Sequence, residues 1–256
     1  MKNNQPLITI ITVVYNGEKH LEQTIQSVIG QNYENVEYII IDGGSTDRTL
    51  DIVKKYEDHI DYWVSEPDEG IYDAMNKGIS IAKGEWINFM NADDWFVDNT
   101  LHLVAEATQN ENPQYIFGDI NKVFEDGTIK LHKGSLSNWK VHAPVCHQAL
   151  FVKTDVLKRL PFDRQYNIMA DYNQMIHLIK EGLPYSVIDG PLANFRLGGF
   201  STVEKTKDRE RFKLQLHHFG LFWATTSFLR QTKKPIIYHS VRGMAKIKNL
   251  WLSIRS

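Results

Sequence analysis

The sequence predicts an α/β fold built on a mainly parallel β-sheet. Two runs, Leu7–Val14 (LITIITVV) and Val36–Ile41 (VEYIII), are almost wholly apolar and rich in β-branched residues, which is typical of strands buried on both faces of a sheet. Each run is followed by a segment that carries apolar residues at helical spacing. Strands and helices that alternate in this way indicate parallel strands joined by crossover helices.

The alternation continues through the first 120 residues, where glycines and short polar turns separate the elements. Strands are expected at Leu7–Val14, Val36–Ile41, Tyr62–Ser65, Trp86–Met90 and Tyr115–Ile120. Helices are expected at Glu18–Ile29, at Ile71–Ala82, where Gly84 stops the helix, and at Thr100–Asn110. A further helix is expected to begin after an N-cap at Thr46 or Asp47.

Beyond residue 120 the alternation loosens. Asp126-Gly127 predicts a hairpin turn, and shorter elements follow it. We expect helices at Thr154–Leu160 and Ala170–Glu181, strands at Tyr185–Ile188 and Leu192–Phe195, and two helices in the last 45 residues. The predicted organisation is therefore a domain over residues 1–205, with halves at 1–120 and 121–205, and a basic amphipathic helical extension over 206–256.

Composition and charge narrow the class of protein. Of 256 residues, 42% are hydrophobic and 23% charged, a globular balance that excludes a disordered chain. The net charge of -2 argues against a nucleic-acid partner. The charge is unevenly placed, however, because residues 212–256 hold 8 Lys and Arg and no acid, which leaves 21 bases and 31 acids in residues 1–211.

The single cysteine, Cys146, excludes a disulfide within the chain and a cysteine-rich zinc site. A half-buried structural thiol is favoured over a catalytic pair with His147, since neighbours in an extended chain face opposite ways. The first apolar run is too short for a signal peptide, and no stretch reaches the ~18 apolar residues of a membrane span. These features favour a cytoplasmic location.

Acidic turns follow the predicted strands. Asp42 follows the second, Asp68 the third, and Asp93-Asp94 the fourth, and ligands bind at the carboxyl ends of the strands in an open parallel sheet. Taken singly, Asp42 could be a turn residue and the Asp93-Asp94 pair a helix cap. Recurrence favours a shared site, and clustered carboxylates with a phosphate ligand suit Mg²⁺ or Mn²⁺.

Common alternatives lack their motifs. The sequence holds no G-x-G-x-x-G, no G-x-x-x-x-G-K-[ST] and no G-x-S-x-G, which disfavours a dinucleotide dehydrogenase, a P-loop enzyme and an α/β-hydrolase. Arg196 lies ahead of a Gly-Gly pair, where it is a candidate diphosphate contact; an ion pair with a surface acid is the alternative.

These residues resemble family 2 glycosyltransferases with the GT-A fold, a Rossmann-like sheet flanked by helices. The resemblance rests on Ile8–Thr49, Ser65–Asp94, the Leu160–Asp163 segment and Met169–Tyr172, and covers about residues 6–200. It is most similar to bacterial enzymes that build cell-surface polysaccharide. It departs from the family pattern at Gly43, Asn91 and Ala170, where many members carry acids, and it lacks the motif of processive synthases.

The resemblance implies a role for each matched residue. A divalent ion, Mn²⁺ or Mg²⁺, would be held by Asp93 and Asp94, and the catalytic base would be Asp171. The nucleotide-sugar would be bound by Val13, Tyr15, Asp42, Asp68, Asn76 and Asp93, together with Arg196. For Asp171 the alternative is a helix cap.

The function expected from this resemblance is inverting, metal-dependent transfer of one sugar from a nucleotide-diphospho-sugar, with UDP as the first choice, to a hydroxyl of a glycan or lipid-linked acceptor. The alternatives are a nucleotidyltransferase, which would need a phosphate loop after the first strand, and an inactive glycan-binding or scaffold protein. Residues 212–256 favour contact with a membrane surface; packing on the domain or on a second subunit, as a homo-oligomer, is the alternative.

Overall fold

The computed structural model describes residues 5–110, 112–198 and 207–231. Nine strands form one sheet in this part of the chain. They are β1 (Ile8–Val14), β2 (Val36–Asp42), β3 (Tyr62–Ser65), β4 (Trp86–Phe89), β5 (Trp95–Phe96), β6 (Tyr115–Val123), β7 (Ile129–His132), β8 (Leu150–Lys153) and β9 (Tyr185–Arg196). The α-helices are α1 (Leu21–Ile29), α2 (Thr49–Lys55), α3 (Ile71–Ile81), α4 (Thr100–Ala107), α5 (Thr154–Arg159), α6 (Ala170–Lys180), α8 (Lys207–Phe219) and α9 (Leu221–Gln231), and short 3-10 turns include η3 (His147–Ala149).

The sheet has the order β3-β2-β1-β4-β8-β6-β9-β5, with β7 on the side of β6. Strands β3, β2, β1 and β4 are parallel, as are β6 and β9. Strand β8 runs antiparallel between β4 and β6, and β5 and β7 are also antiparallel to their neighbours. The four parallel strands β3, β2, β1 and β4 agree with the predicted α/β fold. The antiparallel pairs all involve β8, β5 or β7, which belong to the rest of the sheet.

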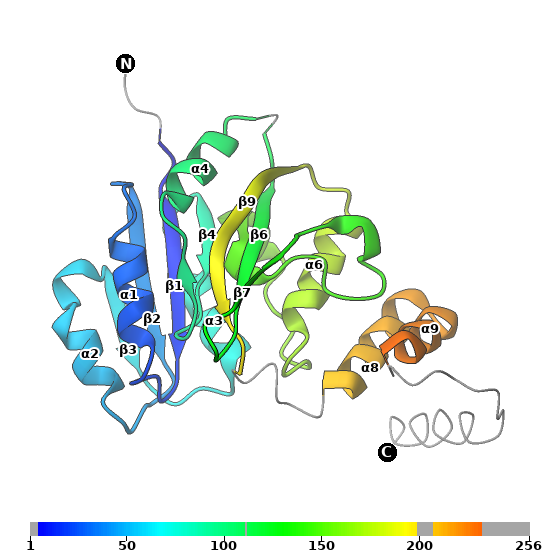
Figure 1. The fold of residues 1–256 in the computed structure, drawn as a ribbon, viewed down its shortest axis with the longest axis horizontal. Helices are drawn as coiled ribbons and strands as arrows, with labels where there is room; N and C mark the ends of the chain where they lie inside the picture. Colours follow the sequence, from blue (N-terminus) through cyan, green and yellow to red (C-terminus); the bar gives the residue numbers. More distant parts are fainter. Residues whose placement is uncertain (1–4, 111, 199–206, 232–256) are drawn as a thin grey trace.

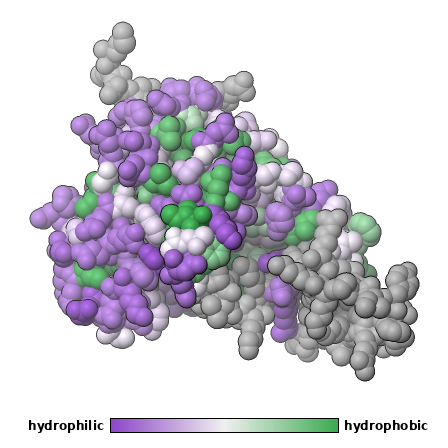
Figure 2. Space-filling view, viewed as in Figure 1, coloured by the Kyte–Doolittle hydropathy of each residue, from purple (hydrophilic) through white to green (hydrophobic). Residues whose placement is uncertain are grey.

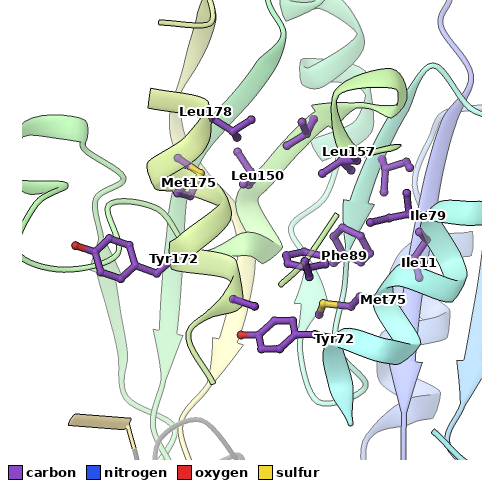
Figure 3. Packing of buried hydrophobic residues seen from close by; sticks show 14 of the residues in the cluster. Ile11, Tyr72, Met75, Ile79, Phe89, Leu150, Leu157, Tyr172, Met175 and Leu178 are labelled. Carbon is purple, nitrogen blue, oxygen red and sulfur yellow. The ribbon is translucent and has the colours of Figure 1, made fainter. Parts of the chain in front are cut away.

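Helices cover both faces of the sheet (Figure 1). The side chains of β1 alternate, so that Ile8 and Ile10 pack with α1, α2 and α4 while Ile11 packs with α3, α5 and α6. All three are fully buried, as the apolar run predicts. Figure 3 shows the second of these cores, with Tyr72 and Met75 of α3 facing the sheet beside α6.

The hairpin and the helices of the second half are found where the sequence predicts them. Strands β6 and β7 pair across Asp126-Gly127, and α5 and α6 match the two predicted helices. The two short strands expected near residue 190 are one strand, β9, which crosses a β-bulge opposite Phe117–Ile120. Strands β5 and β8 are not among the predicted elements.

The C-terminal helices α8 and α9 lie on the side of the molecule where α6 is found (Figure 1). Phe212 and Leu214 of α8 and Ala224 of α9 are buried, and Leu214 joins the core that contains α6. The alternative of packing on the domain therefore holds for α8. The boundary expected at 205–206 and residues 232–256 lie outside the described part of the chain. No described helix combines the length and apolarity that a membrane crossing requires.

Candidate active site

The carboxyl ends of β1, β3 and β4 open into one cavity, which we name the central cavity. Its volume is about 1180 Å³, and its far wall comes from η3, the start of α6 and α8. Six of the predicted site residues line it, namely Val13, Tyr15, Asp68, Asp93, Asp171 and Arg196. Asp42, Asn76 and Asp94 do not belong to the lining. The fold thus gathers residues from both halves of the sequence around one space.

The loop after β1 forms the first wall. Tyr15 is 65% exposed, so its ring is available to a ligand. The next residue, Asn16, has φ 50°, a left-handed conformation that asparagine tolerates better than most residues. Its backbone N–H donates to Ser45 Oγ over 2.7 Å and its Oδ1 accepts from Thr46 N over 2.9 Å. The loops after β1 and β2 are therefore fixed to each other.

Asp42 at the end of β2 is buried, and its carboxylate is used within the fold. Oδ2 accepts hydrogen bonds from Gly44 N over 3.1 Å, from Ser45 N over 2.9 Å and from Ser65 Oγ over 2.6 Å. The Ser45 hydroxyl donates to Oδ1. Asp42 thus stabilises the turn and ties it to β3, which is the turn-residue alternative that the sequence leaves open.

Two predicted residues of the α3 region have different surroundings. Asp68 lines the central cavity, and its Oδ1 accepts from Gly70 N over 2.8 Å. Asn76 instead bonds to the backbone of Phe162 in both directions, Nδ2 to the carbonyl over 2.9 Å and Oδ1 from the N–H over 2.9 Å. Asn76 therefore joins α3 to the segment before α6.

Gly43 explains one departure from the family pattern. A Cβ at this position would lie 2.5 Å from Asp68 Oδ2, well inside van der Waals contact. The Asp68 carboxylate therefore occupies the space beside residue 43 that an acidic side chain would need.

The acidic loop after β4 divides its carboxylates between two tasks. Asp93 lines the central cavity. Asp94 is fully buried, and its oxygens accept from Gln148 Nε2 over 2.6 Å and from the Arg196 N–H over 2.9 Å. Of the two predicted metal ligands, only Asp93 has a carboxylate on the cavity side, because that of Asp94 ties the loop to η3 and β9.

Burial governs the electrostatics of this loop. Loss of solvation raises the pKa of Asp93; a hydrogen bond from its own backbone, and then the electrostatic effect of the neighbouring His20, Arg196 and His147, act against that increase. Burial, and then the neighbouring Asp93 charge, raise the pKa of Asp94 well above its usual range. Carboxylates that are costly to ionise in the free protein gain from a cation.

Arg196 at the end of β9 is fixed above this loop. Its Nε donates to the Asp93 carbonyl over 3.3 Å and a terminal nitrogen donates to Gln23 Oε1 over 2.7 Å. The guanidinium carbon lies 4.8 Å from the centre of the Trp95 ring, a cation–π contact. These partners are an amide, a carbonyl and a ring, and among the residues that the structure describes Arg196 forms no surface ion pair, the alternative considered for it.

Asp171 lies in the first turn of α6 and faces the central cavity. Its Oδ1 accepts from the Tyr172 N–H over 2.7 Å and from the Tyr72 hydroxyl over 3.3 Å. Oδ2 lies 3.4 Å from Nδ1 of His147. The carboxylate therefore has partners on α3, α6 and η3, and its Oδ2 faces the imidazole of His147.

Several cavity residues were not predicted from the sequence. They include His20, Arg164, Arg211 and, on η3, His147. Next to His147, Cys146 is half-buried, as expected, and also borders the cavity. The adjacent Gln148 bonds to Asp94 while His147 approaches Asp171, so this turn joins the acidic loop to α6. The sequence shows only a His-Gln pair at this place, which does not identify its partners.

Two buried polar atoms in the described part of the chain have no protein partner and belong to residues lining the cavity: Asn91 Oδ1 and His147 Nε2. No group of three or more His, Cys, Asp or Glu suited to a metal occurs among the described residues. The Asn91 amide oxygen and the Asp93 carboxylate nevertheless supply two hard oxygens in one loop. That set fits a Mg²⁺ or Mn²⁺ ion held mainly by substrate phosphates, the usual arrangement for Mg²⁺.

Comparison with known sequences identifies relatives. A glycosyltransferase named for PGL/p-HBAD biosynthesis in Mycobacterium bovis is 27% identical over 175 residues, which cover 66% of this chain and 68% of the relative. An uncharacterized glycosyltransferase of Mycobacterium tuberculosis is 41% identical over 175 residues, covering 65% of this chain and 66% of the relative.

Solved structures match the fold at low sequence identity. Residues 1–349 of S. aureus TarS, in complex with UDP, superpose with a TM-score of 0.67 at 20% identity; the match covers 82% of this chain and 64% of that TarS chain, less than two thirds of its length. A mannosyltransferase of Pyrobaculum calidifontis, in complex with GDP-Man and Mn²⁺, gives 0.60 at 16% identity and covers 91% of this chain and 67% of the other.

These matches agree with the architecture described above. The curled, mixed sheet flanked by helices is the GT-A fold of those neighbours. The sequence model of the family described as "Glycosyl transferase family 2" matches residues 9–160, more than half of the chain. The chain is therefore a glycosyltransferase and belongs to the family 2 glycosyl transferases.

Proposed function

We propose that this enzyme transfers a single sugar, with inversion, from a nucleotide-diphospho-sugar to a hydroxyl of a glycan or lipid-linked acceptor, and that a divalent ion assists. The observation that carries the proposal is the central cavity, which has Asp93 and Tyr15 on one wall and Asp171 on the other. Its volume of about 1180 Å³ exceeds the ~300–1,000 Å³ of a usual small-molecule site, which leaves room for two reactants.

The donor would lie against the loops after β1 and β4. Val13 and Tyr15 would contact the base, with Asp68 beside them, and Arg196 would contact the diphosphate. Neighbouring structures hold UDP, UDP-GlcNAc and GDP-Man, and UDP is the base that we propose for this chain. Asp42 and Asn76 support the walls of this site through the turn and the segment that they hold.

Asp93 and Asn91 would hold the ion, with Asp94 fixing their loop from behind. A divalent ion at this place stabilises the negative charge of the departing diphosphate. The donor set is weaker than two carboxylates, since the Asn91 amide brings no charge. Binding of the ion is therefore expected to depend strongly on the nucleotide diphosphate.

Asp171 would accept the proton of the acceptor hydroxyl. The hydroxyl oxygen bonds to the anomeric carbon as the carbon–oxygen bond to the diphosphate breaks, and the bonding electrons leave with the diphosphate. Attack from the side opposite the leaving group gives inversion. His147, beside Asp171 Oδ2, keeps the carboxylate turned toward the cavity.

The test is a screen of UDP-, GDP-, CMP- and dTDP-sugars with Mn²⁺, followed by transfer assays. We expect a UDP-sugar to raise the melting temperature and to be consumed by the wild-type enzyme. Asp171→Asn should abolish transfer and keep UDP binding, whereas Asp93→Ala should weaken UDP binding in the presence of Mn²⁺. If the wild type binds the nucleotide-sugar and does not consume it, the result would instead support an inactive glycan-binding protein that has kept the fold. The uncharged residues Gly43, Asn91 and Ala170 favour that alternative.

We also propose peripheral attachment to the cytoplasmic face of a membrane through the C-terminal segment. Leu221 and Phe222 at the start of α9 are 53% and 71% exposed, apolar atoms are visible at this end of the molecule in Figure 2, and residues 212–256 carry 8 bases and no acid. Basic and apolar groups together favour an anionic lipid surface. Co-sedimentation with anionic vesicles should fall in Leu221→Ser/Phe222→Ser; equal binding by that variant would contradict attachment here.

A further inference from the structure

The start of α6, which carries Asp171, depends on a side chain from the C-terminal helix α8. The backbone N–H groups of Asn167, Ile168 and Met169 all donate to the carboxylate of Glu210, over 2.9, 2.8 and 3.2 Å. Met169 is the N-cap of α6 and makes no side-chain cap of its own, so its N–H is one of the helix-terminal groups that need an acceptor, and Asn167 and Ile168 belong to the segment that leads into the helix. Glu210 therefore supplies the acceptor from a separate element.

The charge of Glu210 suits this place. A carboxylate is stabilised at a helix N-terminus by the helix dipole and by charge-assisted hydrogen bonds from backbone N–H groups. Both of its oxygens are engaged, Oε1 by one N–H and Oε2 by two. The same segment is held from the opposite side, where the Tyr72 hydroxyl donates to the Ile168 carbonyl over 2.9 Å.

Helix α8 is firmly attached, so Glu210 acts from a fixed position. Phe212 and Leu214 are buried at 1% and 0% exposure. Gln215 Nε2 donates to the carbonyls of Lys140 and Val141, over 3.3 and 2.8 Å. The neighbouring Arg211 lines the central cavity, so α8 reaches the site itself.

We infer that Glu210 is a positioning residue of the active site, which fixes the N-terminus of α6 and thereby the carboxylate of Asp171. The inference rests on the proposed role of Asp171 as the base. It extends the active site to α8, which lies beyond the matched residues 9–160 of the family. Since the hydrogen bonds of Glu210 go to the segment before α6 and not to the loops after β1 and β4, it should affect the chemical step more than donor binding.

The experiment compares full-length wild type, Glu210→Gln, Glu210→Asp and a matched control, Glu181→Gln. Glu181 follows the other end of α6 and forms a surface ion pair with Arg159 over 2.7 Å. Hydrogen exchange is measured for the peptide covering residues 167–171, UDP binding with Mn²⁺ by calorimetry, and kcat and KM with the donor that the wild type consumes.

In Glu210→Gln we expect exchange at residues 167–169 to rise about ten-fold, because an amide cannot accept all three bonds. We expect kcat to fall about ten- to one-hundred-fold, the effect of a misplacement near 1 Å, with donor KM and UDP affinity within two-fold. Glu210→Asp should fall between Glu210→Gln and wild type.

Exchange at 167–169 equal to that of Glu181→Gln would overturn the inference, as would a kcat within two-fold of that control. A drop in UDP-binding stoichiometry in proportion to kcat would also overturn it, because it would mean a smaller folded fraction. If the wild type transfers no sugar, the proposed function fails, while the exchange data still decide whether Glu210 holds α6.

Discussion

The adjacent acids Asp93 and Asp94 should respond to mutation in opposite ways, and the structure gives the size of the difference. In Asp94→Ala, the Gln148 Nε2 and Arg196 N–H donors both lose their acceptor in a fully buried place. An unsatisfied buried donor costs about 1–3 kcal/mol. The free energy of unfolding should therefore fall by about 2–6 kcal/mol for two donors.

Asp93→Ala should leave the melting temperature unchanged or slightly raised. Its carboxylate faces the cavity, and burial raises its pKa, so removal of the charge relieves a desolvation cost. For a chain of this size about 1 kcal/mol corresponds to ~2–4 °C in Tm. The two variants should therefore differ by roughly 5–20 °C, with Asp94→Ala the less stable.

The assay measures the thermal unfolding of each variant, with circular dichroism as the signal, first without metal and then with UDP and Mn²⁺. Asp98→Ala is the matched control, since Asp98 is an exposed carboxylate a few residues further on, between β5 and α4, and should change stability by no more than about 0.5 kcal/mol. Asp93→Ala should lose most of the Mn²⁺-dependent response to UDP. A Tm of Asp94→Ala within 2 °C of the wild type, with loss of that response, would refute the division and make Asp94 a ligand.

Three further predictions follow from single contacts. Gly43→Asp should lower Tm because its Cβ would lie 2.5 Å from Asp68 Oδ2. Calorimetry should find the double variant Gly43→Asp/Asp68→Gly more stable than Gly43→Asp alone. A double variant with the same Tm as Gly43→Asp would contradict the proposed clash. Asn76→Ala removes two 2.9 Å hydrogen bonds to the Phe162 backbone, so urea unfolding should show that the free energy of unfolding falls by about 1–3 kcal/mol; an unchanged midpoint would contradict the link between α3 and the segment before α6. Burial lowers the pKa of His218 to about 4, so the unfolded chain binds a proton at a higher pH than the folded protein does. The free energy of unfolding should therefore fall by at most about 3 kcal/mol as the pH drops from ~6.5 to ~4. Urea titrations should show a flatter pH dependence for His218→Gln, and an equally steep dependence would mean that other groups cause the acid sensitivity.

The fold of the first half could be predicted because its strands are buried on both faces. The runs at β1 and β2 contain few polar residues, and no other element explains such a pattern as well. Strand β8 has four residues and β5 has two, too few for a periodicity to appear. Both are defined by their neighbours in the sheet rather than by their own sequence.

The site could be predicted by region but not by side chain. Asp93 and Asp94 are equivalent as letters in a turn, yet only one carboxylate reaches the cavity. The direction of each depends on Gln148 and Arg196, which join the loop from distant parts of the chain. His147 escaped prediction for the same reason, since its relation to Asp171 exists only after η3 and α6 pack together.

The charge division of the chain coincides with a division of tasks within α8. Glu210 is the last acidic residue of the sequence, and it accepts from the backbone that leads to Asp171. The residues after it include many bases and apolar side chains and no acid, but Phe212 and Leu214 are buried against the domain, so the basic segment does not begin as a separate tail. A deletion near residue 211 would therefore remove part of the core along with any lipid-binding surface, and its loss of vesicle binding would have two explanations. Exposed positions such as Phe222 separate the two, because their replacement leaves α8 and its hold on α6 in place.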